Sequence, residues 1–220
     1  MTTRPRPRAS VALMAGYHSP QLDVDVRLNT NESPEPPPPA FSAAVAERIA
    51  AIDWHRYPSR SATELRAGIG ALHDLPPTRV FAANGSNEVL QTLLLTYGGP
   101  GRTAAVFEPT YALHGHLSRV TGTEVAEGER AADFALDLDE VTRVLREHRP
   151  AVTFLCSPNN PTGMVDSPDT VAAVLALVQE TGGLLCVDEA YGQFAPWSAQ
   201  ELLGDEVPLV VSRTYSKTWA

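Results

Sequence analysis

Short apolar runs alternate along the chain with segments in which apolar residues recur every three or four positions. Runs of four to eight apolar residues are typical of buried strands, whereas the longer spacing is typical of helices with one buried face. The clearest helical spacing lies within Pro168–Thr181, where Val171, Val174, Leu175 and Val178 share a face. This alternation predicts an α/β fold with a largely parallel sheet.

The same patterns predict the other elements and two helix caps. Predicted strands are Arg79–Ala83, Thr103–Phe107, Glu124–Ala126, Ala151–Cys156, Leu184–Val187 and Pro208–Ser212. Predicted helices are Ala40–Ile52, Ser61–His73, a segment after Asn84 that runs to about Tyr97, Tyr111–Thr121 and Leu138–Glu147. Ser61, with Glu64 three residues on, and Asp137 are of the residue types that cap helices.

The chain divides by composition into an arm and one large domain. Residues 1–25, which begin with a basic, proline-rich stretch, are expected to form a flexible N-terminal arm, and residues 26–220 a single domain. Hydrophobic residues make up 43% of the 220 residues, enough for a substantial core. The net charge of −9 argues against general nucleic-acid binding. The sequence contains neither a membrane-spanning apolar run nor a signal-peptide core, so we expect a cytoplasmic protein.

The cysteines and histidines suggest no metal site. Cys156 and Cys186 each lie in a predicted buried strand, which favours core thiols in a reducing compartment over a disulfide. A catalytic thiol is the alternative, but neither cysteine has a histidine nearby in the sequence. His114 and His116 are two positions apart and would point to different faces of a helix. No zinc or dinuclear-metal spacing is present, and no metal is predicted.

Lys217 is the single lysine among seventeen basic residues. Arginine replaces lysine where only charge is needed, but guanidinium is not a useful nucleophile. Lys217 is therefore a candidate reactive amine, although a composition that favours arginine explains the count as well.

Polar residues follow the carboxyl ends of the predicted strands, where ligands gather in open parallel sheets. Asn84–Asn87 opens a helix, so its amides could bind a phosphate or form an ordinary capped turn. Ser157–Gly163 has the prolines and glycine of a rigid turn, with its asparagine amides expected to point outward or to serve the turn alone.

Two further strand ends carry an acid and an amine. Asp188 follows a buried strand, where a carboxylate needs a cationic partner unless it is a helix cap. Thr214 and Ser216 place two hydroxyls beside Lys217. An anion cradle, a fixed amide, a strand-end acid and one amine at the same edge form the set that a pyridoxal phosphate enzyme needs.

Several of these segments resemble the class I/II aminotransferases of the aspartate aminotransferase fold. The matching motifs are Ser157–Gly163, Val187–Tyr191 and Ser212–Lys217. Three others are more narrowly similar to the histidinol-phosphate aminotransferases, namely Leu28–Pro34, Arg56–Pro58 and Asn84–Glu88. The resemblance runs from about residue 26 to the end. It implies pyridoxal 5'-phosphate as cofactor and the large domain of fold type I, incomplete at its C-terminus.

The resemblance also implies residue roles. Lys217 would hold the cofactor covalently and move a proton at the substrate, while Asp188 would keep the pyridine nitrogen protonated. Asn160 and Tyr191 would hydrogen-bond the ring oxygen, and Tyr111 would stack on the ring. The phosphate would be bound by the backbone amides of Ser86 and Asn87, by the hydroxyls of Thr214 and Ser216, and by Tyr57 of the neighbouring subunit in a homodimer.

The reaction that the resemblance implies exchanges an amino group between L-histidinol phosphate and 2-oxoglutarate in histidine biosynthesis. An aromatic amino acid aminotransferase and a phosphothreonine decarboxylase of the same fold are the alternatives. Ser33, Pro36–Pro39 and Asn87 depart from the usual subfamily pattern of asparagine, a glycine-containing turn and aspartate. These departures loosen the subfamily assignment more than the fold.

The family's sequences continue past the active-site lysine. They add an arginine at the phosphate, a strand in the middle of the sheet and a small C-terminal domain, which implies that this sequence stops within the large domain. An inactive remnant, or a fragment that needs a complementary chain, is therefore a third alternative. We expect the 220 residues alone to aggregate and to lack transaminase activity, because an unfilled sheet position exposes strand edges.

Overall fold

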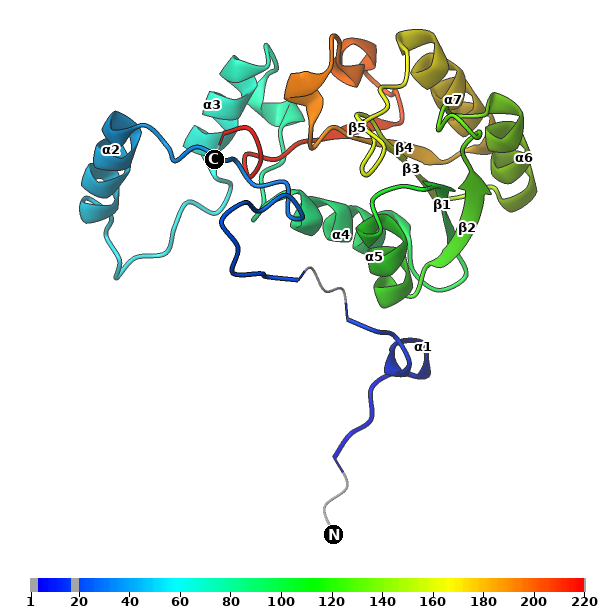
Figure 1. Cartoon of the computed structure of the whole chain (residues 1–220), viewed down its shortest axis with the longest axis horizontal. Coiled ribbons are helices and arrows are strands. Elements are labelled where there is room, and N and C mark those ends of the chain that lie inside the picture. Colours follow the sequence, from blue (N-terminus) through cyan, green and yellow to red (C-terminus); the bar gives the residue numbers. More distant parts are fainter. Residues whose placement is uncertain (1–3, 17–19, 220) are drawn as a thin grey trace.

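A five-stranded parallel sheet forms the centre of the computed structural model, which describes residues 4–16 and 20–219 (Figure 1). The strand order is β2-β1-β3-β4-β5, and every neighbouring pair is parallel. The strands are β1 (Thr103–Glu108), β2 (Glu124–Glu129), β3 (Val152–Cys156), β4 (Leu184–Asp188) and β5 (Leu209–Ser212). The largely parallel α/β sheet predicted from the sequence is confirmed.

Helices cover both faces of this sheet. The α-helices are α1 (Ala9–Ala12), α2 (Pro39–Ala50), α3 (Thr63–Leu72), α4 (Ser86–Tyr97), α5 (Leu113–Thr121), α6 (Leu138–His148) and α7 (Pro168–Thr181). Three short 3-10 helices are η1 (Pro77–Arg79), η2 (Gly192–Phe194) and η3 (Ala199–Leu202). Apart from the strand predicted over 79–83, each predicted element begins and ends within three residues of its observed bounds.

The core has two layers, one on each face of the sheet. Side chains alternate between the faces of a strand, so neighbouring residues of β1 enter different layers. Phe107 packs with the buried faces of α6 and α7, including Val144 and Val174, whereas Val106 packs on the other face with Leu94 of α4. Buried apolar runs therefore mark strands that are covered on both sides.

The predicted strand Arg79–Ala83 is wrong. Pro77–Arg79 forms η1, and the segment that follows is not part of the sheet, although Val80 has extended backbone angles of −110° and 128°. A strand requires a hydrogen-bonding partner, and β5, the nearest edge of the sheet, pairs only with β4 among the described residues. The residues of this segment favour an extended backbone, but a strand forms only when the segment pairs with a neighbouring strand.

One of the two predicted caps is confirmed. Asp137 accepts hydrogen bonds from the backbone N–H groups of Asp139 (2.9 Å) and Glu140 (3.4 Å). The predicted cap Ser61 is wrong, because α3 begins two residues later with Ala62 at the N-cap in the left-handed conformation (φ 46°). No side chain caps α3, so the capping box with Glu64 does not form.

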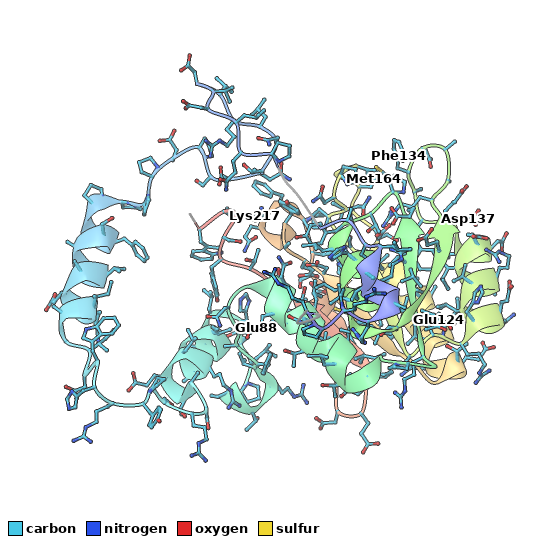
Figure 2. All side chains as sticks on the ribbon, turned by 90° about the horizontal axis from the view of Figure 1, so that it is seen from below. Glu88, Glu124, Phe134, Asp137, Met164 and Lys217 are labelled. Carbon is cyan, nitrogen blue, oxygen red and sulfur yellow. The ribbon has the colours of Figure 1, made fainter. Side chains whose placement is uncertain are left out.

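The N-terminal segments lie at the outside of the molecule. Within the predicted arm, α1 lies against α5, and Arg8 donates a hydrogen bond to the carbonyl oxygen of Val120. Residues 1–3 and 17–19 of the arm lie outside the described residues. Helix α2 stands apart from the body in both views and buries none of its residues (Figures 1 and 2). No helix in the described part of the chain is long and apolar enough to cross a membrane.

Candidate functional site

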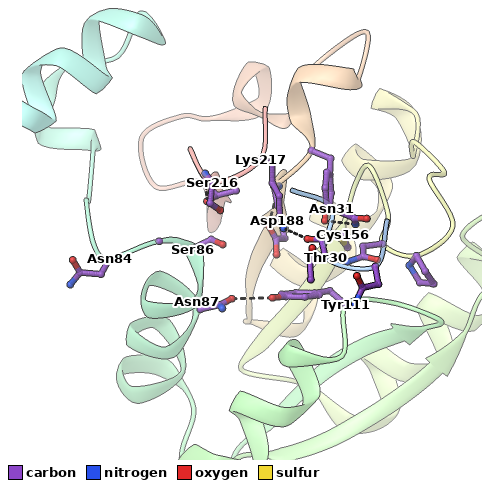
Figure 3. Close-up of a pocket in the computed structure, with 17 residues that line it drawn as sticks. Thr30, Asn31, Asn84, Ser86, Asn87, Tyr111, Cys156, Asp188, Ser216 and Lys217 are labelled. Atoms are coloured by element: carbon purple, nitrogen blue, oxygen red, sulfur yellow. Dashed lines mark hydrogen bonds between the residues drawn. The ribbon is translucent and has the colours of Figure 1, made fainter. Parts of the chain in front are cut away.

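A pocket of about 730 Å³ opens beside the carboxyl ends of the strands (Figure 3). Its walls come from the loop before α2, the start of α4, the loop after β3, and the residues that follow β4 and β5. It brings together every predicted site residue except Tyr57: Ser86, Asn87, Tyr111, Asn160, Asp188, Tyr191, Thr214, Ser216 and Lys217. Among these predicted residues, Ser86 and Lys217 are the farthest apart in the sequence, at 131 positions, and both line the one cavity.

Asp188 is the buried acid of the pocket, with a relative exposure of 1%. Its Oδ1 accepts hydrogen bonds from the Ser212 hydroxyl (2.9 Å) and from the backbone N–H of Ala190 (3.2 Å). Its Oδ2 lies 3.0 Å from Nε2 of His114, a distance at which a ring N–H donates to a carboxylate. A histidine from α5 is therefore the side chain that faces Oδ2 of this acid.

The sequence raised His114 only as a possible metal ligand and gave no sign of its contact with Asp188. The ring is fully buried, stacks on Phe154 (centroids 4.7 Å apart, planes at 5°) and meets the edge of Tyr111 (5.4 Å, 88°). These contacts fix the plane of the imidazole and so the direction of its bond to Asp188. A buried helix histidine below a strand-end acid is a pairing that only the fold reveals.

Lys217 projects into the same pocket from the loop after β5 (Figure 3). Its Nζ donates a hydrogen bond to the backbone carbonyl of Thr30 (3.0 Å) and lies 5.9 Å from the centre of the Tyr191 ring. The single lysine of the chain thus shares a cavity with the buried acid, as the strand-end positions predicted.

The start of α4 and the loop after β5 are the two segments predicted to bind an anion, and both line the pocket. Gly85 is the N-cap, with a left-handed φ of 79°, and no side chain caps the helix. The first amides of α4 therefore have no side-chain cap, and uncapped helix starts of this kind are places where proteins can bind anions. The hydroxyls of Thr214 and Ser216 lie 2.7 Å apart and line the same cavity.

The two asparagines of the loop after β3 have different tasks. Asn160 lines the pocket, but Asn159 is 2% exposed, so the expectation that both amides point outward is wrong for Asn159. The Asn159 amide donates to the carbonyl oxygen of Pro109 (3.0 Å) and to the hydroxyl of Thr162 (2.8 Å). It ties the loop to the neighbouring strand end and thereby holds Asn160 at the pocket.

A partly buried ion pair joins the ends of β4 and β5. Arg213 donates to Oε2 of Glu189 (2.5 Å), and Glu189 also accepts from the Ser198 hydroxyl (2.8 Å) and the Ala199 N–H (2.6 Å). Glu189 and Arg213 adjoin Asp188 and Thr214 in the sequence, so the pair fixes the spacing of the acid and the hydroxyl. The sequence shows two opposite charges beside predicted site residues, but it does not show that they pair.

Both cysteines are buried and not bonded to one another. Burial and the nearby Asp188 raise the pKa of Cys156 to about 12, and burial raises that of Cys186 well above its usual value. Thiols with such pKa values are poor nucleophiles at neutral pH, in agreement with core thiols. Among residues 4–16 and 20–219, no group of three or more histidine, cysteine or acidic side chains is arranged to hold a metal ion.

Tyr57 lies outside the pocket and is fully exposed. It follows α2, the helix that stands apart from the body. Within a single chain the structure does not bring Tyr57 to the other predicted site residues.

Comparisons with known proteins show the family of the chain. The family model described as aminotransferase class I and II matches residues 23–220. The histidinol-phosphate aminotransferase of Frankia casuarinae is 46% identical over 97% of this chain and 57% of its own length, and that of Mycolicibacterium smegmatis is 46% identical over 93% and 56%. The chain therefore spans little more than half the length of these curated relatives.

Solved structures give the same correspondence. The crystal structure of histidinol-phosphate aminotransferase from Sinorhizobium meliloti in complex with pyridoxal-5'-phosphate is 25% identical, with a TM-score of 0.75. The match covers 86% of this chain and 51% of that one. The sheet and helices described above thus correspond to about half of a fold type I aminotransferase.

Proposed function

The chain belongs to the class I and II aminotransferase family, and from this premise we propose that it contributes the cofactor-binding domain of a histidinol-phosphate aminotransferase. The reaction would transfer an amino group from L-histidinol phosphate to 2-oxoglutarate, a step of histidine biosynthesis. The observation that carries the proposal is the pocket that holds both the amine of Lys217 and the buried carboxylate of Asp188.

The donor set of the pocket fits pyridoxal 5'-phosphate. The uncapped start of α4 and the hydroxyls of Thr214 and Ser216 suit a phosphate, and the buried carboxylate of Asp188 suits a protonated ring nitrogen. Lys217 provides the amine for covalent attachment. When bound, this cofactor supplies an electron sink for the bonds broken at the substrate carbon that carries the amino group.

The residues of the chain then have separate tasks. Asp188, held by His114 and Ser212, would keep a proton on the ring nitrogen of the cofactor. Lys217 Nζ would take and return a proton at the substrate carbon that carries the amino group. Tyr111, which donates to Asn87 (3.3 Å) and packs on His114, presents its ring at the side of the cavity.

We also propose a homodimer in the cytoplasm. Helix α2 buries none of its residues within one chain, and Phe41, Val45 and Ile49 on it are 38–55% exposed at a spacing that places them on one face. A second subunit that covers this face would bring Tyr57 to the partner's phosphate site. The two unpaired buried thiols suit a reducing compartment.

Replacement of the amine tests the proposed function. In the full-length product of the reading frame, Lys217→Ala removes the group that attaches the cofactor, so the visible absorbance of the bound cofactor should disappear. Turnover of histidinol phosphate should fall by at least about 10²- to 10⁴-fold from lost proton transfer alone. Lys217→Arg, which keeps the charge, should fail equally. A Lys217→Ala variant that kept both absorbance and turnover would refute the proposal.

Substrate rates separate the alternatives within the fold. Turnover should be highest with histidinol phosphate and 2-oxoglutarate. Faster turnover of phenylalanine would favour an aromatic amino acid aminotransferase, and carbon dioxide release from threonine phosphate would favour the decarboxylase.

A further inference from the structure

Two neighbouring residues of the loop before α2 contact the two polar groups in the centre of the pocket (Figure 3). The carbonyl oxygen of Thr30 accepts from Lys217 Nζ at 3.0 Å. The side-chain amide of Asn31 donates to the hydroxyl of Tyr191 at 2.8 Å, across 160 positions of sequence. The loop therefore closes one side of the site through defined hydrogen bonds.

The backbone of Asn31 directs its side chain toward this contact. Its φ is 52°, in the left-handed region that asparagine, aspartate and glycine adopt more readily than other residues. The contact thus depends on an asparagine for two reasons, since the backbone conformation and the donated hydrogen bond both suit this residue type.

The direction of this hydrogen bond determines what the Tyr191 hydroxyl can offer. A tyrosine hydroxyl has one proton to donate and two lone pairs to accept with. Since the Asn31 amide donates to the oxygen, the hydroxyl proton is directed elsewhere. Lys217, whose Nζ lies 5.9 Å from the ring centre, is the charged group that faces Tyr191 from the loop after β5.

We propose that Asn31 is a positioning residue: by donating to the Tyr191 oxygen, it directs the hydroxyl proton away from the loop before α2 and toward the ligand that the pocket would hold. Only the identity of that ligand, pyridoxal 5'-phosphate, rests on the proposed function. The orientation itself is a property of the chain and can be measured without cofactor.

Two variants separate orientation from mere packing. Asn31→Gly keeps the left-handed backbone and removes the donor. Asn31→Asp keeps the shape and the backbone preference but replaces the donor by an acceptor, which would draw the Tyr191 proton toward itself. Asn29→Asp is the matched control, because it adds the same charge two residues away, where the Asn29 amide donates to Pro20 (2.7 Å) and not to Tyr191.

The measurement is the titration of Tyr191 in the full-length, cofactor-free protein by fluorine NMR of incorporated fluorotyrosine, assigned by the loss of its signal in Tyr191→Phe. A donor to the phenolate oxygen lowers a tyrosine pKa and a carboxylate raises it, so Asn31→Gly should raise the Tyr191 pKa by about 0.5 and Asn31→Asp by about 1 or more. Asn29→Asp should cause less than about half the shift of Asn31→Asp, because its charge is farther away and screened.

A second readout uses the bound cofactor. The pH at which the visible absorbance of bound pyridoxal phosphate changes should rise in Asn31→Asp by more than in Asn31→Gly, with thermal unfolding confirming that each variant is folded. A Tyr191 pKa that Asn31→Gly leaves unchanged, or that Asn29→Asp shifts as much as Asn31→Asp, overturns the positioning role. Failure of the unmodified protein to bind the cofactor counts against the proposed function instead, and the cofactor-free titration still decides the role of Asn31.

Discussion

At the scale of the residue, the sequence indicates that Asp188 is part of the site, and the fold supplies its partners. A carboxylate at the end of a buried strand already demands a partner, because an unpaired buried charge costs several kcal/mol. The sequence therefore predicts that Asp188 is special, and its place in a recognisable motif predicts its role. It does not reveal that His114 and Ser212 are the partners, since these lie 74 and 24 positions away and meet the acid only through the fold.

Cys156 provides a prediction at this scale. It lines the pocket, but it is 2% exposed, and its pKa is raised to about 12. At pH 8 about one thiol in 10⁴ is then ionised, so a thiol reagent should leave the folded protein unmodified over hours. The measurement is mass spectrometry after treatment with iodoacetamide, with unfolded protein as the control, in which Cys156 and Cys186 both react. Rapid modification of Cys156 in the folded protein, with loss of turnover, would contradict this prediction and would show that the thiol is reactive.

At the scale of the elements, the predictions that rest on local periodicity are confirmed, whereas one that depends on a distant partner is wrong. Helix and strand positions follow from apolar periodicity, which is a local property, and α7 matches its predicted bounds at both ends. The prediction of a strand over Arg79–Ala83 is wrong because strand formation depends on a pairing partner and not only on the residues of the segment. The same distinction explains Ser61, whose residue type suits a cap, although the chain turns at Ala62.

Gly183, which lies directly before β4, has no room for a side chain. A side chain at Gly183 would overlap the backbone carbonyl oxygen of Pro150, which cannot move aside without disturbing β3. Gly183→Ala should lower the free energy of unfolding by about 1–3 kcal/mol and shift the strand that ends at Asp188. Chemical denaturation measures the first effect, and cofactor affinity the second.

The matched control is Gly68→Ala on α3, where a new Cβ has no atom within 4 Å. It should raise the free energy of unfolding by about 0.5–1 kcal/mol, since alanine favours the helix. Equal effects of the two substitutions would mean that the contact with Pro150 is not maintained in solution.

At the scale of the whole molecule, two features face away from the core. Helix α2 stands apart with an exposed apolar face, and β5 pairs on one side only among the described residues (Figures 1 and 2). An apolar groove of about 360 Å³ runs beside β5 and is lined in part by Phe81 and Val211. Exposed edges and apolar surfaces promote association. The expectation that residues 1–220 aggregate when expressed alone stays a prediction, to be tested by light scattering.

The proposed homodimer predicts complementation between two inactive variants of the full-length protein. Lys217→Ala and Tyr57→Ala subunits damage different residues, and a mixed dimer contains one site with both residues intact if Tyr57 acts across the interface. After random mixing, half of the dimers are mixed and half of their sites are intact, so about a quarter of the unmodified activity should return. Activity that stays at the level of the separate variants would show that Tyr57 does not act in the neighbouring site.

The sequence alone determined where the strands end along the chain, because strand periodicity is a local property. It also showed the lone lysine and the motifs around Asn160, Asp188 and Lys217, since side-chain chemistry is local as well. Parallel pairing then required that these ends meet at one edge. The partners of the central groups depended on the tertiary structure: His114 beneath Asp188, and Asn31 against Tyr191. Such contacts join segments that no local pattern relates, and packing alone selects them.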